Sequence, residues 1–375
     1  MTSGARRATS SRAARGVAPR GEAPPSLTAR ILRDRIKWRL HHALLSVCPG
    51  YRSATRGGSR GCAGDGGGHV PGRLLERHPG KYSLYQTNEK VPYGSLLAFN
   101  VEDAADFDLM EQAILDSGYY EAPHIWPLRV DRDKRVMAEI VASLNQGGRV
   151  LELGCANGAV LEGLALRGIE FEGIDISRRA LARASRAVRA HVHLGDVLTS
   201  DLSPGFDTIF GLDIFEHLNP NKLASYLLRL RELLADGGLL FANIPAFGID
   251  EVFGEVFPRY LSEWDVDAAA GRPFRQLHAD HEGYPISGHL IWADSSWWVG
   301  QFSSADFRRR TLIEVALHDK YDDYMAVHSP ARRSFYVFSA GECPDEPEIV
   351  RRITRSRSLE LMTLRRLETL AMLWR

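Results

Sequence analysis

The sequence predicts an α/β protein built on a doubly wound, mostly parallel sheet of seven strands. From about residue 149 onward, short apolar runs alternate with segments of helical periodicity, and the links between them are short. The first apolar run leads directly into a turn between Gly154 and Gly158. Short strand–helix–strand links favour parallel pairing with helices on both faces of the sheet. A ligand of such a fold is expected beyond the carboxyl ends of the strands.

Seven runs are expected to form the strands because they are apolar, short and bounded by turn residues. They cover 149–153, 171–174, 191–194, 208–212, 239–244, 312–318 and 334–338.

Helices are expected wherever apolar residues recur every three or four positions. Two precede the first strand, over 103–116 and 131–144. A third covers 158–166, a fourth is capped by Ser177, and a fifth begins at Asn219-Pro220.

Composition places the chain among ordinary globular proteins. It has 375 residues, of which 44% are hydrophobic and 25% charged, so a collagenous, wholly disordered or membrane-embedded chain is excluded. No apolar run approaches the ~20 residues that span a bilayer. Four scattered cysteines, Cys48, Cys62, Cys155 and Cys343, offer neither a disulfide framework nor a zinc motif. A cytoplasmic protein is therefore expected.

The chain divides into segments of different character. Residues 1–72 hold thirteen Lys and Arg against three Asp and Glu, so a basic, mostly disordered extension is expected there. A short helix within it at 31–45, or an organelle transit peptide, are open alternatives. Too few aromatic residues accompany the arginines to indicate nucleic-acid binding. The expected segments that follow are an N-terminal helical cap at 73–130, a cofactor-binding core at 131–246, an acceptor-site insertion or lid at 247–300, closing strands at 301–341, and a linker with a terminal amphipathic helix at 342–375.

The terminal helix is expected from the 3, 4, 3 spacing of Leu364, Leu367, Ala371 and Trp374 among arginines. It has three open interpretations: docking on its own domain, contact with another subunit or partner, or contact with a membrane surface.

The first predicted strand, turn and helix carry the strongest chemical signal. Glycines let the backbone turn sharply and approach a ligand, and the helix that follows presents unpaired N–H groups. The spacing is GxxxG rather than the GxGxxG of dinucleotide sites, so a diphosphate ligand is not expected. The candidate binding residues here are Glu152, Gly154, Cys155, Ala156, Asn157 and Gly158.

Carboxylates follow the next strands. Asp175 stands 21 residues after Gly154, where an acid accepts hydrogen bonds from both hydroxyls of a ribose. Asp196 follows the third strand, within reach of an adenine amine. Together these groups describe a pocket for adenosine with a short zwitterionic arm, to which Ile176, Val197 and Asp213 are added as neighbours. The alternatives are a turn without a ligand, a helix N-terminal charge at Asp175 and a turn cap at Asp196.

In these motifs the sequence resembles the class I S-adenosylmethionine-dependent methyltransferases over about residues 130–245 and the late strands. The motifs that carry the resemblance are ELGCANG (152–158), GIDIS (173–177), GDV (195–197), FDTIFGLDIFEHL (206–218) and LLADGGLLFANIP (233–245). Ala156 stands where many members have glycine. The resemblance implies a Rossmann-like methyltransferase fold, S-adenosyl-L-methionine as cofactor, and a ribose-binding role for Asp175.

Methyl transfer to a hydroxyl or ammonium needs a base, and Glu216 and His217 follow the fourth predicted strand. Alternatively, this pair satisfies local backbone groups, or Asp213, Glu216 and His217 bind a metal in a spacing that resembles the ExxEH of divalent-cation-dependent relatives. We expect no metal.

The insertion supplies the secondary base candidates, His281 and His289. It also supplies His278, Asp280, Trp292, Trp297 and Trp298, which could bind a sugar or ring-bearing acceptor or pack as a lid. The run GHLIWA (288–293) followed by Trp297-Trp298 is similar to bacterial methyltransferases associated with surface glycans.

The sequence therefore predicts an enzyme that moves a methyl group from S-adenosylmethionine to an oxygen or nitrogen of a small molecule or glycan. A noncatalytic scaffold with the same fold is the alternative from another class. A nicotinamide oxidoreductase is disfavoured by the missing GxGxxG.

Overall fold

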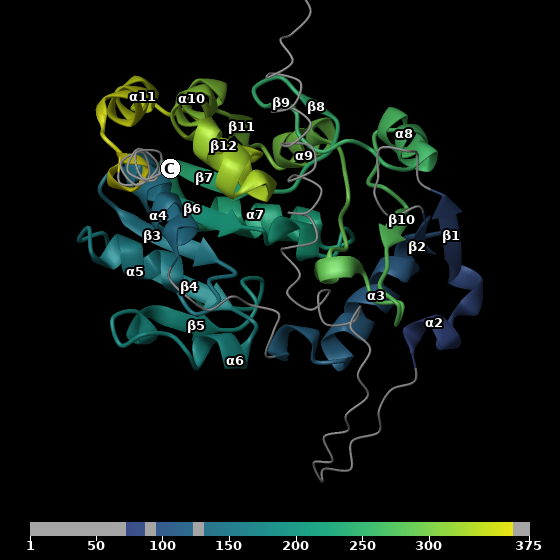
Figure 1. The fold of residues 1–375 in the computed structure, drawn as a ribbon. Coiled ribbons are helices and arrows are strands. Elements are labelled where there is room, and N and C mark those ends of the chain that lie inside the picture. Colours follow the sequence, from purple (N-terminus) through teal and green to yellow (C-terminus); the bar gives the residue numbers. More distant parts are fainter. Residues whose placement is uncertain (1–72, 87–94, 123–130, 363–375) are drawn as a thin grey trace, which may run out of the picture.

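The computed structural model describes residues 73–86, 95–122 and 131–362 (Figure 1). Its strands are β1 (Tyr82–Gln86), β2 (Ser95–Asn100), β3 (Arg149–Leu153), β4 (Phe171–Asp175), β5 (Val192–Leu194), β6 (Phe206–Leu212), β7 (Leu234–Asn243), β8 (Ile249–Asp250), β9 (Gly254–Glu255), β10 (Gln276–His278), β11 (Arg308–Arg309) and β12 (Phe335–Ser339). Its α-helices are α2 (Leu74–Arg77), α3 (Ala104–Asp116), α4 (Arg132–Leu144), α5 (Ala159–Ala165), α6 (Arg178–Leu181), α7 (Leu223–Leu233), α8 (Ser262–Ala269), α9 (Ser295–Ser304), α10 (Thr311–His328) and α11 (Glu346–Arg355). The short 3₁₀ turns that matter below are η3 (Tyr119–Glu121), η5 (Phe215–His217), η6 (Ile286–Gly288) and η7 (Pro330–Arg332).

The central sheet has seven strands in the order β11-β12-β7-β6-β3-β4-β5. Strands β3 to β7 pair in parallel, whereas β12 runs antiparallel to both β7 and β11. This arrangement confirms the predicted doubly wound, mostly parallel fold. Strand β3 is the first strand of this sheet along the chain, and it pairs with β4 on one side and β6 on the other. The strand order therefore reverses at β3, and a ligand is expected at the carboxyl end of this strand.

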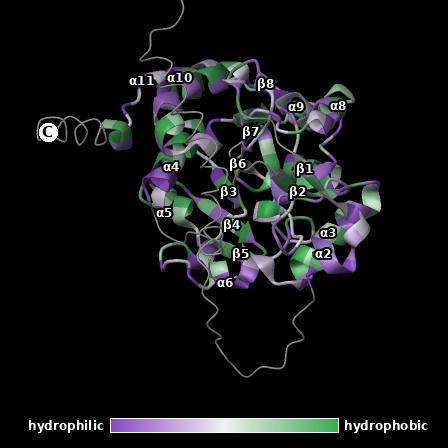
Figure 2. Ribbon diagram, turned by 45° about the vertical axis from the view of Figure 1, so that its right-hand side comes forward, coloured by the Kyte–Doolittle hydropathy of each residue, from purple (hydrophilic) through white to green (hydrophobic). Residues whose placement is uncertain are grey.

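The sheet is buried because helices cover it. Leu151, Ile209 and Phe241 are fully buried, as expected for strands that are apolar on both faces. Helices α5, α4, α11 and α10 pack side by side in that order. The surrounding helices carry both hydrophobic and hydrophilic residues (Figure 2), as helices with one buried face do.

The prediction of a strand at 312–318 is wrong, because these residues lie in the helix α10. Ile313, Leu317, Tyr321 and Tyr324 are buried at helical spacing, whereas Leu312 is 65% exposed. The short, β-branched apolar run suggested a strand, but its continuation has the helical period. The edge strand is β11, only two residues long, just before the helix.

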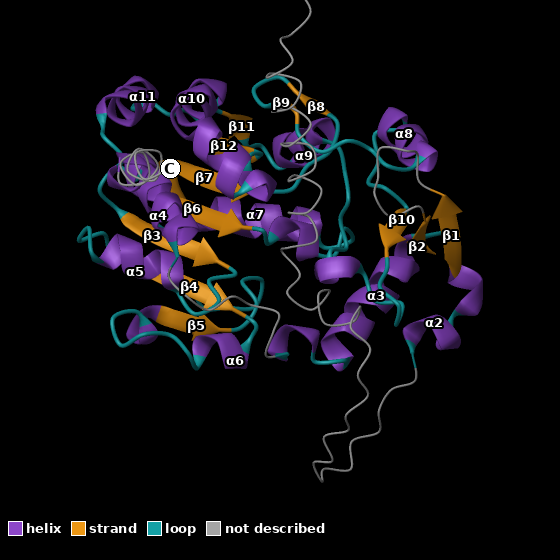
Figure 3. Cartoon of the chain, in the orientation of Figure 1, coloured by secondary structure: helices purple, strands orange, loops and turns teal. Residues whose placement is uncertain are grey.

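The expected helical cap at 73–130 is corrected in part. Helix α3 is present with Asp103 as its N-cap, but β1 and β2 form an antiparallel pair in the same segment. Strand β10, from the insertion, pairs with β2 and completes a small sheet in the order β1-β2-β10. The carboxyl ends of β3, β4 and β6 point toward this small sheet (Figure 3). The two segments therefore face the predicted ligand edge together.

Other boundaries also differ. Helix α7 starts at Leu223, after a turn at Asn219, and β7 starts at Leu234, earlier than the predicted 239. The insertion contains α8, α9 and the β8–β9 pair, so it is more regular than a loop. Cys155 and Cys343 are free and buried. The extension at 1–72 and the predicted terminal helix with Leu364, Leu367, Ala371 and Trp374 lie outside the described residues. Among the described helices, none has the length and apolar character needed to cross a membrane.

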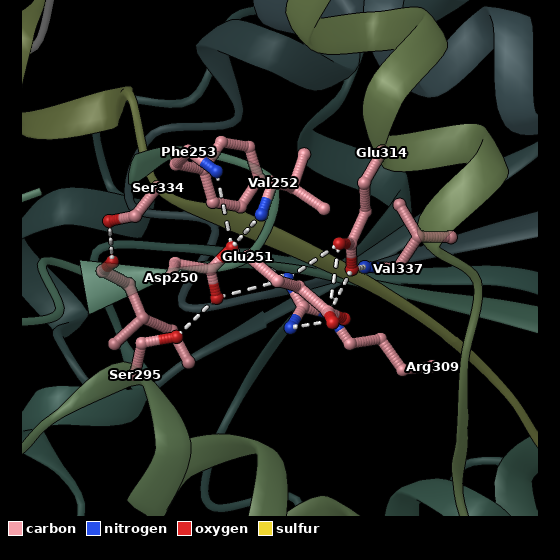
Figure 4. Close-up of polar contacts among 10 residues, drawn as sticks. Asp250, Glu251, Val252, Phe253, Ser295, Arg309, Glu314, Ser334 and Val337 are labelled. Atoms are coloured by element: carbon pink, nitrogen blue, oxygen red, sulfur yellow. Dashed lines mark hydrogen bonds and ion pairs between the residues drawn. The ribbon is translucent and has the colours of Figure 1, made fainter. Parts of the chain in front are cut away.

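A buried charge network fastens the insertion to the core. Arg309 lies between Asp250 and Glu314 (Figure 4). Its Nη2 donates to Asp250 at 3.0 and 3.1 Å, and its Nε donates to Glu314 at 2.9 and 3.1 Å. Asp250 also accepts from the Ser295 hydroxyl, and Glu314 accepts from the Val337 N–H. Strand β8, helix α9, β11 and α10 are thereby joined.

This network predicts a pH-dependent stability. Burial raises the pKa of Glu314 from 4.5 to about 7, despite its pairing with Arg309. The folded state therefore binds more protons than the unfolded state between these values, so stability falls as pH rises through this window. Relative to Glu314→Gln, the free energy of unfolding of the wild type should fall by about 2 to 3 kcal/mol between pH 5 and pH 8. Urea unfolding at several pH values measures this difference. If the free energy of unfolding changed equally with pH in the wild type and in Glu314→Gln, the prediction would be contradicted.

Candidate active site

The turn after β3 places backbone, not side chains, at the edge of the sheet. Gly154, Ala156 and Gly158 have φ values of 68°, 48° and 70°. The N–H groups of Gly154 and Cys155 both donate to the carbonyl of Ile174, which ties the turn to β4. A Cβ on Gly154 would lie 2.8 Å from Ile214, so this position has no room for a side chain. Ala156 adopts the left-handed region that glycine adopts without strain. This is the position at which many members of the resembled family have glycine.

Asp175, at the end of β4, is 9% exposed. Its Oδ2 accepts from the Ala156 N–H and its Oδ1 from the Ser177 N–H, both at 2.7 Å. Burial raises the pKa of this carboxyl, while the two backbone donors act in the opposite direction. Each carboxylate oxygen keeps a lone pair for a further donor. Asp175 can therefore hold the turn and bind two hydroxyl groups.

Glu152 is buried beside the same turn. Its Oε2 has no hydrogen-bond partner among the described residues. Burial raises the pKa of this carboxyl well above its ordinary value, and the charge of Asp175 adds to the effect. A buried carboxyl without a partner is costly. A ligand ammonium group at this point would satisfy it, so the residue fits the zwitterionic arm inferred from the sequence.

The other predicted neighbours have mixed surroundings. Asp196 accepts from the Tyr226 hydroxyl at 2.6 Å and from the Leu198 N–H at 2.9 Å, so its local turn-capping role is present. Ile176 is 47% exposed, whereas Val197 is buried.

Two further candidates in the turn are buried. Cys155 lies behind the turn, where its Sγ would be 2.8 Å from a Cβ on Gly173. Burial raises the pKa of the Cys155 thiol well above its ordinary value, which is typical of a packing residue. Asn157 is buried as well.

Asp213 follows β6 with a φ of 52°. Its Oδ2 accepts from Arg332 Nη2 at 3.1 Å and from Nε at 3.2 Å, and its N–H donates to the Asn243 carbonyl. Arg332 belongs to η7, about 120 residues further along the chain, and was not predicted from the sequence. The guanidinium offsets the charge of Asp213 at the edge of the sheet.

Three of the four predicted catalytic candidates come together. We call Glu216, His217 and His289 the Glu–His–His cluster. One potential ligand atom from each lies within 4.8 Å of the others. The imidazole rings of His217 and His289 are 4.7 Å apart and nearly perpendicular, and His289 Nε2 lies 3.9 Å from Glu216 Oε1.

The cluster forms because the insertion docks on η5. The N–H groups of Leu290 and Ile291 donate to the Glu216 carbonyl at 2.8 and 2.9 Å. This contact places His289, just after η6, against the end of β6. Glu216 thus uses its backbone to anchor the insertion.

Burial shifts the ionisation of all three side chains toward their neutral forms. It raises the pKa of Glu216 well above its ordinary value, with the charge of Asp213 adding to the rise. It lowers the pKa of His217 to about 4 and that of His289 well below its ordinary value. The two imidazoles are neutral at pH 7 and can each accept a proton or a cation.

Tyr120 joins the cluster to the turn. Its hydroxyl lies 3.4 Å from His217 Nδ1, and its carbonyl accepts from the Ser177 hydroxyl at 3.0 Å. Burial raises the pKa of the Tyr120 phenol, and the charges of Glu216 and Asp175 add to the rise. This residue was missed in the sequence; the tyrosine pair at 119–120 was the only signal there.

The remaining insertion candidates lie elsewhere or pack. His281 is exposed, in a turn where Asp280 accepts from the Glu282 and Tyr284 N–H groups, and it is not part of the cluster. His278 is buried and stacks on Trp264 at 4.8 Å. Trp292 and Trp298 are buried too, so these aromatic rings pack against the protein rather than line an open surface.

Comparison with known proteins finds related methyltransferases. A methyltransferase-domain family matches residues 129–283. A ubiquinone biosynthesis O-methyltransferase from Alkalilimnicola ehrlichii is 30% identical over 125 residues, which are 32% of this chain and 48% of that protein. Nodulation protein S from Azorhizobium caulinodans is 25% identical over 170 residues, covering 43% of this chain and 79% of that protein. The chain spans about half the length of the first relative.

Among solved structures, the chain is similar to the CcbJ methyltransferase from Streptomyces caelestis. The two share 18% identity at a TM-score of 0.39, over 58% of this chain and 99% of that chain.

The seven-stranded sheet and the matched domain define a methyltransferase fold. Both support a class I S-adenosylmethionine-dependent methyltransferase, as the sequence motifs implied. S-adenosylmethionine is the cofactor of this class.

Proposed function

We propose that this protein transfers a methyl group from S-adenosylmethionine to an oxygen or nitrogen of a small molecule or glycan. One observation carries the proposal. The turn at Gly154 and the Glu–His–His cluster lie at the same edge of the sheet, linked through Tyr120. The proposed cofactor site and the proposed proton acceptors would therefore be adjacent. The names of the two relatives, an O-methyltransferase and a nodulation protein, support the transfer without fixing the acceptor.

The chain's own residues would divide the binding between them. The backbone at Gly154 would approach the ligand closely, Asp175 would accept hydrogen bonds from the ribose hydroxyls, and Glu152 would face the ammonium group. An ammonium group beside Glu152 favours the ionised carboxylate and offsets the cost of its burial. When bound, S-adenosylmethionine supplies a methyl carbon activated by a positively charged sulfur.

The protein's task in the transfer is alignment and exclusion of water, because the methyl carbon is already activated. The insertion covers the end of β6 through its contacts with the Glu216 carbonyl. His217 is the first candidate to take a proton from a hydroxyl or ammonium acceptor, because its imidazole is neutral at pH 7. Glu216 and His289 stand beside it.

Asp175→Ala should weaken binding of S-adenosylhomocysteine by about 1 to 3 kcal/mol, since the ribose loses a charged acceptor. Calorimetric titration measures the change. Asp201→Ala, which removes an exposed carboxylate from a loop, is the matched control and should bind as the wild type does. Unchanged affinity in Asp175→Ala would remove this residue from the cofactor site.

Release of S-adenosylhomocysteine in the presence of candidate acceptors tests the proposed function. The panel should contain phenols, sugars with free hydroxyls and amino sugars. Trp292 and Trp298 of the insertion are buried, so they do not indicate which class of acceptor binds. We expect release above the acceptor-free rate with at least one class. Binding of S-adenosylhomocysteine without release from any acceptor would instead favour a noncatalytic scaffold.

A further inference from the structure

We propose that the Glu–His–His cluster binds a transition-metal ion such as Zn²⁺, and that this ion binds the hydroxyl oxygen of the methyl acceptor. The second half of this statement rests on the proposed function. It narrows the acceptor from oxygen or nitrogen to oxygen.

The geometry of the cluster is close to that of a metal site. Zinc–nitrogen and zinc–oxygen bonds are about 2.0 to 2.2 Å long, so ligand atoms on one ion lie at most about 4.4 Å apart. The three potential ligand atoms here lie within 4.8 Å of one another, and one pair is 3.9 Å apart. Small side-chain rotations would bring them onto a common ion.

A second observation points to a cation at this position. The Glu216 side chain is 1% exposed, and neither of its oxygens has a hydrogen-bond partner among the described residues. Three other deeply buried carboxylates in the described structure are paired with arginine, Asp250 and Glu314 with Arg309 and Asp267 with Arg272 and Arg275, whereas Glu216, like Glu152 in the turn, has no such partner. An unpaired buried carboxylate costs several kcal/mol, so a carboxyl placed here needs a cation or a proton.

The surroundings hold the ligands in place. The backbone of Gly288 hydrogen-bonds the ring of His217, and the Tyr120 hydroxyl lies 3.4 Å from its Nδ1. The Trp292 indole N–H donates to the backbone carbonyl of His289 at 3.2 Å, which holds the main chain of this residue. Outer hydrogen bonds to the ring, as at His217, orient metal-binding histidines.

The donor set selects the class of metal. Two imidazoles and one carboxylate suit zinc and similar transition ions, whereas Mg²⁺ and Ca²⁺ prefer oxygen ligands. The set also differs from the Asp213, Glu216 and His217 spacing considered in the sequence. Asp213 is paired with Arg332, and His289 from the insertion completes the cluster instead.

Three protein ligands leave coordination positions open, as in catalytic rather than structural zinc sites. A bound ion lowers the pKa of an oxygen that coordinates to it. A hydroxyl acceptor on such an ion would lose its proton to solvent and present an oxygen lone pair to the methyl carbon. The carbon–sulfur bond would break, with its electron pair remaining on sulfur.

The test measures metal binding directly. The full chain is stripped with a chelator and titrated with Co²⁺, whose visible absorption reports ligation, and then with Zn²⁺ in competition. We expect one equivalent of Co²⁺ to bind and to be displaced by Zn²⁺. Glu216→Gln and His289→Gln should each weaken binding more than about 100-fold, beyond the 10- to 100-fold cost of losing an outer partner. His191→Ala, which removes an exposed histidine at the amino end of β5, should bind as the wild type does.

S-adenosylhomocysteine titration verifies that each variant keeps its fold, because the cluster lies outside the turn. Absence of Co²⁺ and Zn²⁺ binding by the wild type would overturn the inference, as would unchanged affinity in both cluster variants. If the wild type binds no metal but still releases S-adenosylhomocysteine with an acceptor, the proposed function stands and this inference fails. If metal binds and only amine acceptors react, the oxygen assignment is wrong.

Discussion

Gly154→Val should abolish binding of S-adenosylmethionine and S-adenosylhomocysteine. The backbone at Gly154 has a φ of 68°, and a Cβ there would lie 2.8 Å from Ile214. A β-branched residue is strongly disfavoured at positive φ, so the turn must move away from the position that admits the ligand. We expect at least a 100-fold loss of affinity, about 2.7 kcal/mol, in a calorimetric titration.

Gly168→Val is the matched control for this change. Gly168 has nearly the same φ, 69°, but a Cβ there would meet nothing within 4 Å. Both variants should lose stability from backbone strain, by about 1 to 3 kcal/mol. Only Gly154→Val should lose the ligand, and normal titration by this variant would show that the close backbone approach has been misread.

His217→Ala should lower the turnover number by about 10²- to 10⁴-fold while leaving the affinity for S-adenosylhomocysteine unchanged. The imidazole stands in the cluster at the end of β6, where we propose that it acts on the acceptor either as a base or as a metal ligand. The measurement is the initial rate of S-adenosylhomocysteine release with the acceptor found in the panel.

His191→Ala, at the amino end of β5 and so at the other end of the parallel strands, should retain the wild-type rate. A wild-type rate in His217→Ala would place the chemistry outside the Glu–His–His cluster. Loss of S-adenosylhomocysteine binding in this variant would instead assign His217 to the cofactor site.

The core of the fold was predictable because its local signals agree. Strands β3, β4 and β6 are short apolar runs that end at glycine or aspartate, and α3 and α4 start at aspartate caps. Here hydrophobic period, capping and turn chemistry all favour the same structure.

Pairing between distant segments was not predictable from local signals. Strand β2 pairs with β10, almost two hundred residues later, and nothing in the short runs at 95–100 or 276–278 specifies that partner. In 312–318 the local pattern was ambiguous, and the helical period became evident only through Tyr321 and Tyr324. Short apolar runs cannot be assigned by periodicity alone.

In the candidate site, too, some residues were predictable from the sequence and others were not. Gly154 and Asp175 could be proposed from the sequence because motif spacing on adjacent parallel strands brings them to one edge. His289 and His281 looked equivalent in the sequence, and only the docking of the insertion on Glu216 separates them. Arg332 and Tyr120 carry no motif, so only the folded chain brings them beside Asp213 and His217.

Titration of the wild-type chain with S-adenosylhomocysteine, followed by NAD, tests the central claim most directly. We expect binding of one S-adenosylhomocysteine per chain, weakened in Asp175→Ala and lost in Gly154→Val, and no binding of NAD. A chain that binds NAD, or that gives no heat with S-adenosylhomocysteine, would contradict the assignment of this site to a methyl donor.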